Sequence, residues 1–242
     1  MQPSCAANRN LMSDALMSIN QTDAQALRPL EPQLLDTCVL QNLDWIDRQL
    51  EPTGSVIWDE AATAKLVQRF GVDLAYDLLD LGTLYKRFEY DGHYPWLVCN
   101  GAVDEAGLLR GEKGERLGQM IEFLAGHQND WGHDAYPGIS QGLLLTEKPG
   151  RVTPLMLRAL GVTSAEQVHD ARGPLAFLPD RGDRLIAAHA LLSNIPIVLT
   201  TDRKTFWQCR GQLAQFGLEV VRPGELLERY ERYWSAKFAQ PR

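Results

Sequence analysis

The sequence lacks long hydrophobic runs, and its cysteines form no recognisable motif. No apolar segment approaches the length that spans a membrane, and the first residues have neither the basic nor the continuous apolar region of a secretory signal. The four cysteines are too widely spaced for a Cys-x-x-Cys zinc knuckle or a dense disulfide framework. These absences predict a cytoplasmic protein that does not associate with membranes.

The sequence also lacks the glycine-rich loops that bind nucleotide phosphates. The segment Gly111-Glu-Lys-Gly-Glu does not end in the Gly-Lys-Ser/Thr of a P-loop, and no Gly-x-Gly-x-x-Gly follows the first predicted strand. A haloacid-dehalogenase-like phosphatase needs a second acid two residues after its first, where this chain has Cys38. Nucleotide-dependent and haloacid-dehalogenase-like functions are therefore disfavoured.

The composition is that of one folded domain with an uneven charge. The 242 residues are 45% hydrophobic, which is enough for one sizeable core, and the net charge is −7. Residues 203–242 nevertheless contain eight Lys or Arg against four Glu. This basic end could contact a polyanion, and a solvated helix face explains the same count.

Hydrophobic periodicity predicts alternating strands and helices. Strands are expected at 33–40, 95–100, 196–200 and 218–221. Helices are expected before Pro52, at 59–90 with a break near Gly71, from Gly101 to Ile121 with a break near Gly111 and Gly114, after the capping-box sequence Thr163-Ser-Ala-Glu166, at 183–193, at 203–215 and from Pro223. This alternation predicts an α/β fold with a central parallel sheet flanked by helices.

The predicted organisation is a single domain with additions. Residues 1–30 lack clear periodicity and are expected to form a loose or docked extension, followed by the domain at 31–242. The helices at 59–90 are interpreted as an α-hairpin insertion after the first βα unit. Residues 126–151 are rich in Gly, Asp, Asn and Pro and predict a long loop.

Three acids stand at the ends of apolar elements. Asp36 interrupts the first predicted strand, Asp183 opens a helix and Asp202 follows a strand. Ligands of open α/β sheets bind beyond the carboxyl ends of the strands, so these acids are expected to meet there. Carboxylates without thiolates or imidazoles favour Mg²⁺ or Mn²⁺. Structural explanations stay open: a helix cap for Asp183, a turn for Asp202 and a hydrogen-bonded buried group for Asp36.

The segments around these acids resemble the PIN-domain nucleases. Leu-Leu-Asp36-Thr-Cys-Val-Leu resembles the first strand of that family, Asp183-Arg-Leu-Ile-Ala-Ala-His-Ala-Leu the helix with its third acid, and Val-Leu-Thr-Thr-Asp202-Arg-Lys-Thr-Phe the strand with its last acid. Gly217-Leu-Glu-Val-Val-Arg-Pro-Gly-Glu-Leu-Leu resembles the closing strand and helix. The resemblance covers residues 33–50, 95–110 and 175–230, and the other segments exceed a minimal toxin-like member.

The second acid of that family is usually a glutamate that opens the helix after the second strand. Leu97-Val-Cys-Asn-Gly-Ala-Val-Asp-Glu105-Ala fits this place, because a proline-led apolar strand precedes it, and Ser55-Val-Ile-Trp-Asp-Glu60-Ala is the competing match. Thr200 could hydrogen-bond a metal-bound water, or end its strand. Asp180 could be an accessory ligand or a loop residue.

The resemblance implies a divalent-metal-dependent endoribonuclease. Its catalytic acids would be Asp36, Glu105, Asp183 and Asp202, with Asp36, Asp183 and Asp202 as ligands of Mg²⁺ or Mn²⁺. The partners implied are an RNA substrate, an antitoxin-like protein and a second copy of the chain. The alternative is a PIN-like module that binds RNA or a protein partner without cleavage.

Basic and histidine side chains complete the set of candidates. Arg203, Lys204 and Arg210 are candidate contacts to RNA phosphates. His189 is expected to be packed and without a role, since it lies about 240° around the helix from Asp183. His127 and His133 are expected to be ordinary residues of the long loop, with a metal-binding role as the alternative.

Overall fold

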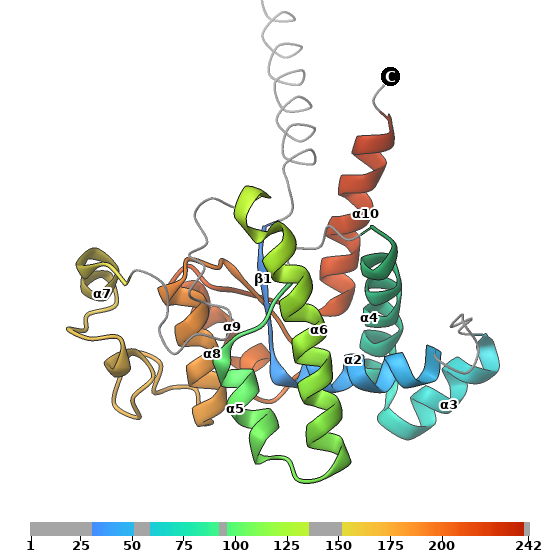
Figure 1. The fold of residues 1–242 in the computed structure, drawn as a ribbon, viewed down its shortest axis with the longest axis horizontal. Helices are drawn as coiled ribbons and strands as arrows, with labels where there is room; N and C mark the ends of the chain where they lie inside the picture. Colours follow the sequence, from blue (N-terminus) through green and yellow to red (C-terminus); the bar gives the residue numbers. More distant parts are fainter. Residues whose placement is uncertain (1–30, 51–58, 92–95, 136–151, 240–242) are drawn as a thin grey trace, which may run out of the picture. The chain divides into compact units, whose positions relative to one another are not determined.

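The computed structural model describes residues 31–50, 59–91, 96–135 and 152–239 (Figure 1). A four-stranded parallel sheet has the order β2-β1-β3-β4, and about nine helices surround it in the described part of the chain. The strands are β1 (Gln33–Leu35), β2 (Trp96–Leu97), β3 (Ile197–Leu199) and β4 (Glu219–Val221). The predicted α/β fold with a parallel sheet is therefore confirmed.

The helices follow the strands in the alternating order that the sequence predicts. Their bounds are α2 (Thr37–Leu50), α3 (Glu60–Phe70), α4 (Val72–Asp91), α5 (Asn100–Leu108), α6 (Glu112–Ala135), α7 (Pro154–Ala159), α8 (Arg181–Leu192), α9 (Phe206–Ala214) and α10 (Pro223–Ala239), with a short 3₁₀ helix, η2 (Glu166–Val168). None of the described helices is long and apolar enough to cross a membrane.

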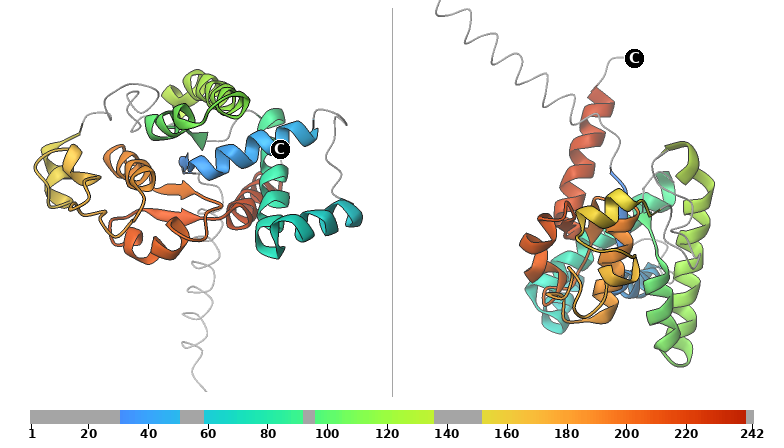
Figure 2. Two further views of the ribbon diagram at one scale, coloured as in Figure 1. Left: turned by 90° about the horizontal axis from the view of Figure 1, so that it is seen from below. Right: turned by 90° about the vertical axis from the view of Figure 1, so that its left-hand side faces the viewer.

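Helices pack on both sides of the sheet (Figure 2), so its central strands are buried on both faces. The register pairs Leu34 with Leu97 on one side and with Val198 on the other, and Val198 with Val220. Strands covered on both faces are continuous apolar runs rather than alternating ones, which is what β1 and β3 show. Because every strand pair is parallel, the carboxyl ends of all four strands lie at the same edge of the sheet.

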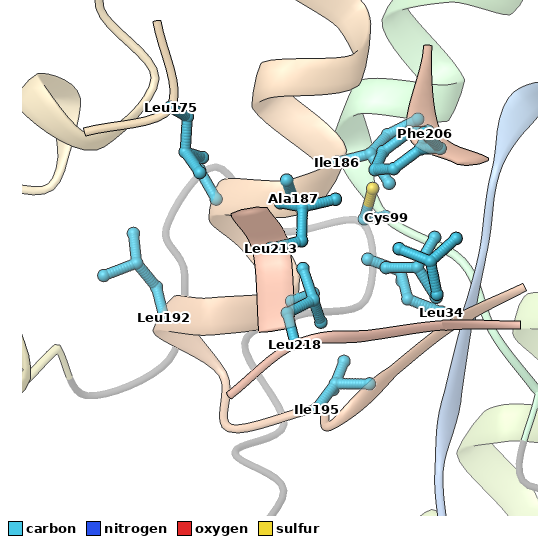
Figure 3. Packing of buried hydrophobic residues seen from close by; sticks show 14 of the residues in the cluster. Leu34, Cys99, Leu175, Ile186, Ala187, Leu192, Ile195, Phe206, Leu213 and Leu218 are labelled. Atoms are coloured by element: carbon cyan, nitrogen blue, oxygen red, sulfur yellow. The ribbon is translucent and has the colours of Figure 1, made fainter. Parts of the chain in front are cut away.

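One part of the core lies between the sheet and the helices α8 and α9. Figure 3 shows Ile186 and Ala187 of α8 with Phe206 and Leu213 of α9 and with Leu34 of β1, all within one buried cluster. Burial of a large apolar side chain stabilises the folded state by roughly 1.5–3 kcal/mol. This packing fixes the position of α8 against the strand ends.

The first strand is shorter than predicted. It ends at Leu35, and α2 begins at Thr37, so Val39 and Leu40 belong to a helix and the prediction of a strand to residue 40 is wrong. The Asp36 carbonyl accepts from Val39 N at 2.9 Å and from Leu40 N at 3.2 Å. A short apolar run fits a strand or a buried helix equally, and Val39 and Leu40 continue the helical stripe of Leu43.

The helical hairpin at 59–90 is confirmed as α3 and α4, which meet at Gly71 with a φ of 79°. The loop predicted at 126–151 is wrong for its first part, because α6 continues to Ala135 and includes His127 and His133. Helix propagation costs little per residue even for polar side chains, so composition alone does not end a helix. Residues 136–151 lie outside the described residues.

Two helix starts also differ from the predictions. The helix expected at 183 begins at Arg181, and the Asp180 carboxylate caps it by accepting from Gly182 N at 2.7 Å. The capping-box sequence at Thr163 gives only the single turn of η2, because the Gln167 side chain, rather than that of Glu166, accepts from Thr163 N at 2.8 Å.

Residues 31–227 form one compact unit, and α10 from Glu228 onward belongs to a second. The residues 1–30, predicted as an extension, lie outside the described residues. So does the competing second strand at 55–58.

Candidate active site

Asp36 lies immediately beyond β1 and is held by hydrogen bonds. Its backbone N–H donates to Leu199 O at 3.0 Å, which extends the sheet by one residue. Its Oδ2 accepts from Thr200 Oγ1 at 2.6 Å and from Cys38 Sγ at 2.8 Å. The side chain is only 3% exposed, and burial raises its pKa to about 6 despite these two donors. The nearby charges of other acids raise the pKa further.

Glu105 reaches the same place from α5, the helix that follows β2. Burial raises its pKa, the charge of Asp180 adds to this, and the nearby Thr37 hydroxyl offsets part of the effect. Gly182 makes room for the carboxylate, since a Cβ at that position would overlap Glu105 Oε1. The first turn of α8 and the acid of α5 are thus in direct contact.

Asp183 lies in the first turn of α8 without capping it. Burial raises its pKa to about 7, the charges of Asp36, Asp180 and Asp202 contribute, and the Thr205 hydroxyl opposes them. The capping role that the sequence left open for Asp183 belongs to Asp180. Helix capping therefore does not account for the presence of Asp183 at this position.

Asp202 has the turn-forming role that the sequence left open. Its carboxylate accepts from Lys204 N and Thr205 N, each at 2.8 Å, and from the Thr205 hydroxyl. Its own backbone N–H donates to Thr200 Oγ1 at 2.9 Å. Thr200 therefore links the loop of Asp202 to the carboxylate of Asp36.

These acids line one cavity of about 770 Å³ at the carboxyl ends of the strands. Six of its lining residues are acidic and one, Arg181, is basic. The acids are Asp36, Asp104, Glu105, Asp180, Asp183 and Asp202. Burial is the main cause of the raised pKa values of Asp36, Glu105 and Asp183, and repulsion from the neighbouring acids adds to it.

The donor set suits a hard cation, because it consists mainly of carboxylate oxygens. Within the described residues, however, no three Asp, Glu, His or Cys side chains are close enough to hold a metal ion as they stand. The chemistry of the cavity therefore fits Mg²⁺ or Mn²⁺, whereas binding would require side chains to move together.

The structure does not bring every candidate to this cavity. Glu60 is exposed at the start of α3 and does not line it. Arg203 contacts Asp73 and lies 3.8 Å from Asp77, so it belongs to an ion-pair network. Lys204 is exposed one residue further on.

Arg210 lies over the ring of Trp207, with its guanidinium carbon 4.2 Å from the ring centroid, and donates to Trp207 O at 2.8 Å. His189 of α8 is partly buried, as expected for a packed side chain. It also lines a second cavity.

Several lining residues had no recognisable signal in the sequence. Cys38 and Thr37 follow Asp36 and contribute a thiol and a hydroxyl, and Gln41 lies one helical turn further. In the sequence, Arg181 and Gly182 form part of an Arg-Gly-Asp tripeptide, which does not by itself indicate a role at this cavity. A helix start at Arg181, rather than at Asp183, is the observation that would have placed both of them beside the acids.

No protein-family model, curated protein or solved structure matches this chain. We therefore infer the function from the geometry and electrostatics of the cavity.

Proposed function

We propose that this chain is a divalent-metal-dependent endoribonuclease with a PIN-like fold. The observation that carries the proposal is the cavity at the strand ends, where six acids face a single arginine. Carboxylates that have no structural counter-charge are costly to keep ionised together, and a divalent cation relieves that cost. The parallel order β2-β1-β3-β4 and the position of the acids support the resemblance that the sequence indicates.

In this proposal Asp36, Asp183 and Asp202 hold Mg²⁺ or Mn²⁺, and Glu105 completes the acidic set. The ion, when bound, lowers the pKa of a water and stabilises charge on the phosphate. Thr200 fixes the rotamer of Asp36 through its 2.6 Å hydrogen bond and fixes the Asp202 loop through its own acceptor oxygen. Asp36 and the Asp202 loop are therefore both positioned by Thr200, which does not itself react.

Arg181 is suited to receive the substrate. It is exposed in the first turn of α8, and it is the one basic side chain among the residues that line the cavity. A guanidinium can donate two parallel hydrogen bonds to a phosphate. Arg181 would thus attract the phosphodiester to a cavity that is otherwise negative, and the exposed Lys204 would add a further phosphate contact.

The second candidate function is a PIN-like module that binds RNA or a protein partner without cleaving. The finding that favours it is that, within the described residues, no three acids form a metal site as they stand. An antitoxin-like partner, a homodimer and a cytoplasmic location belong to the proposal in either form.

The test is cleavage of mixed RNAs by the purified chain, with Mn²⁺ or with chelator. We expect metal-dependent cleavage that is lost in Asp36→Asn and Glu105→Gln but retained in Glu60→Gln, the matched control from the competing sequence match. Tight RNA binding without cleavage would support the module instead. Loss of cleavage in Glu60→Gln with activity in Glu105→Gln would overturn the assignment of the second acid.

A further inference from the structure

A second cavity of about 490 Å³ lies between α5 and α8, next to the carboxylate cavity. It shares Asp104 and Leu185 with that cavity, so the two are neighbours. Its volume falls within the range of small-molecule pockets, roughly 300–1,000 Å³. Along α8, Asp183 and Ala188 are separated by a rise of about 7 Å, so an extended ligand can reach both cavities.

One face of each helix lines this second cavity. Residues at helical spacing contribute from α5 and from α8, and the segment Ala165–His169 closes the third side; the helical residues are Asn100, Val103 and Asp104, and Leu185, Ala188, His189 and Leu192. The opposite face of α8, with Ile186 and Ala187, is in the core (Figure 3). The cavity is thus built from rigid elements.

Arg184 holds the closing segment in place. Its Nε donates to His169 O at 3.1 Å, and its Nη1 donates to Leu178 O at 2.8 Å and to Pro179 O at 2.9 Å. Three backbone carbonyls of one loop are therefore tied to α8 by a single guanidinium. The wall that carries His169 is fixed relative to His189.

The walls combine apolar side chains, two imidazoles and the carboxylates of Asp104 and Glu166. Val103, Leu185, Ala188 and Leu192 offer aliphatic surface, on which a flat ring can pack. Burial lowers the pKa of both His169 and His189, which favours the neutral form of both imidazoles. Neutral imidazoles favour an uncharged ring over a phosphate.

His189 is left with an available donor. Its Nδ1 is buried and has no hydrogen-bond partner among the described residues. A buried N–H without an acceptor is costly, so the ring proton belongs on Nε2, which can donate to a bound molecule. The carboxylate of Asp104, near enough to influence the pKa of His189, can accept from an amino group.

We propose that this second cavity binds an unpaired nucleobase that carries an exocyclic amino group. The base packs on the aliphatic walls, accepts a hydrogen bond from His189 Nε2 and donates its amino group to Asp104. The assignment deepens the proposed nuclease function and rests on it for its role, which is to select the nucleotide beside the scissile phosphate. Adenine, cytosine and guanine fit this description, and uracil does not.

The test uses free nucleosides with the full chain in chelator, where no phosphodiester is present to be cut. Adenosine, cytidine, guanosine and uridine are titrated while the imidazole ¹⁵N resonances are recorded. We expect the three amino nucleosides to shift the His189 and His169 signals and uridine to bind about tenfold more weakly, the effect of losing one hydrogen bond to a charged group.

Two variants and a control complete the experiment. Val103→Trp fills the cavity from a position 36% exposed, and His189→Leu removes the donor; each should weaken nucleoside binding about tenfold or more. Leu155→Trp adds the same ring at an exposed position of α7 and should leave binding unchanged. Resonances that ignore all four nucleosides, equal binding of uridine, or unaltered binding by Val103→Trp would each overturn the proposal.

The outcomes separate the two proposals. If the chain binds nucleosides but never cleaves RNA, the base site is supported and the nuclease proposal is rejected. If the chain cleaves RNA with metal but its histidine resonances do not respond to nucleosides, the nuclease proposal is supported and the base site is rejected.

Discussion

Two groups of acids lie in the same compact unit, and they differ in what neutralises them. Asp77 of α4 is 5% exposed and accepts from Arg222 Nε at 3.1 Å, with a second nitrogen of the same guanidinium in contact. Arg203 lies 3.8 Å from Asp77 and pairs with Asp73. Among the described residues that line the cavity around Asp36, in contrast, Arg181 is the one basic side chain.

The difference assigns different tasks to the two groups. Around Asp77 the protein supplies its own positive charges, so the network is complete within the fold. Around Asp36 compensation must come from protons or from a bound cation, since burial, with a smaller contribution from the neighbouring acids, raises the pKa values of Asp36 and Asp183 to about 6 and about 7. We interpret the first group as structural and the second as functional.

The structural group also supports the functional one. Arg203 follows Asp202 directly, so its contacts with Asp73 and Asp77 tie the Asp202 loop to α4. Arg222 reaches the same Asp77 from the start of α10, where its N–H donates to Glu225 Oε2 at 2.9 Å in a capping arrangement. Helix α4 thus helps to position Asp202.

The largest effect is expected from breaking the compensated group. Asp77→Asn leaves the buried guanidinium of Arg222 without its counter-charge and should lower the free energy of unfolding by about 3–5 kcal/mol. Asp73→Asn is the matched control, because the Asp73 side chain is 69% exposed and its pair should be worth less than about 1 kcal/mol. Urea denaturation of both variants measures the difference, and equal small losses would contradict the comparison.

Removing a charge from the uncompensated group should raise the free energy of unfolding at neutral pH instead of lowering it. The folded-state pKa of Asp36 is raised, so its contribution to stability is complete at low pH and is lost as pH rises from about 4 through about 6. Asp36→Asn in chelator should abolish this loss, by as much as about 3 kcal/mol at pH 7.5. Urea denaturation at pH 4.5 and 7.5 tests it; the same pH dependence in wild type and variant would refute the assignment.

A smaller effect should separate stability from metal binding. Gly182→Ala gains up to about 1 kcal/mol of helix propensity, yet its Cβ displaces the Glu105 carboxylate. Gly107→Ala on α5 is the control, since nothing lies within 4 Å of the new Cβ. We expect only Gly182→Ala to weaken Mn²⁺ binding, measured by calorimetry. Unchanged affinity would show that Glu105 lies outside the metal site.

The smallest effect concerns the two neighbouring cations. Lys204→Gln should lower the salt dependence of RNA binding by about 0.7 in log–log slope, because one phosphate contact of a single strand is lost. Arg203→Gln should leave that slope unchanged and lower stability instead, since Arg203 is engaged with Asp73 and Asp77. Filter binding at several salt concentrations distinguishes them, and the reverse ranking would make Arg203 the RNA contact.

The sequence predicted the parallel sheet and the order of its helices because hydrophobic periodicity is a local property. It predicted that Asp183 would lie at a helix start, which the structure shows. Asp36 was expected inside a strand and lies just beyond it, and Glu105 was expected to open a helix and lies in the second turn of α5. It did not predict that α2 begins at Thr37, since the run Val39-Leu40 fits either element. The roles of Cys38 and Gly182 depend on contacts between distant elements, which no local pattern encodes.

The central claim is that the acids around Asp36 are held for a cation, and thermal unfolding with Mn²⁺ tests it most directly. Wild type in chelator and with excess Mn²⁺ should differ by about 2.7 kcal/mol at a hundredfold excess over the dissociation constant, because the ion binds only the folded state. Asp73→Asn should keep this response, and Asp183→Asn should lose most of it. A wild type that ignores Mn²⁺, or an Asp183→Asn variant that responds fully, would contradict the account.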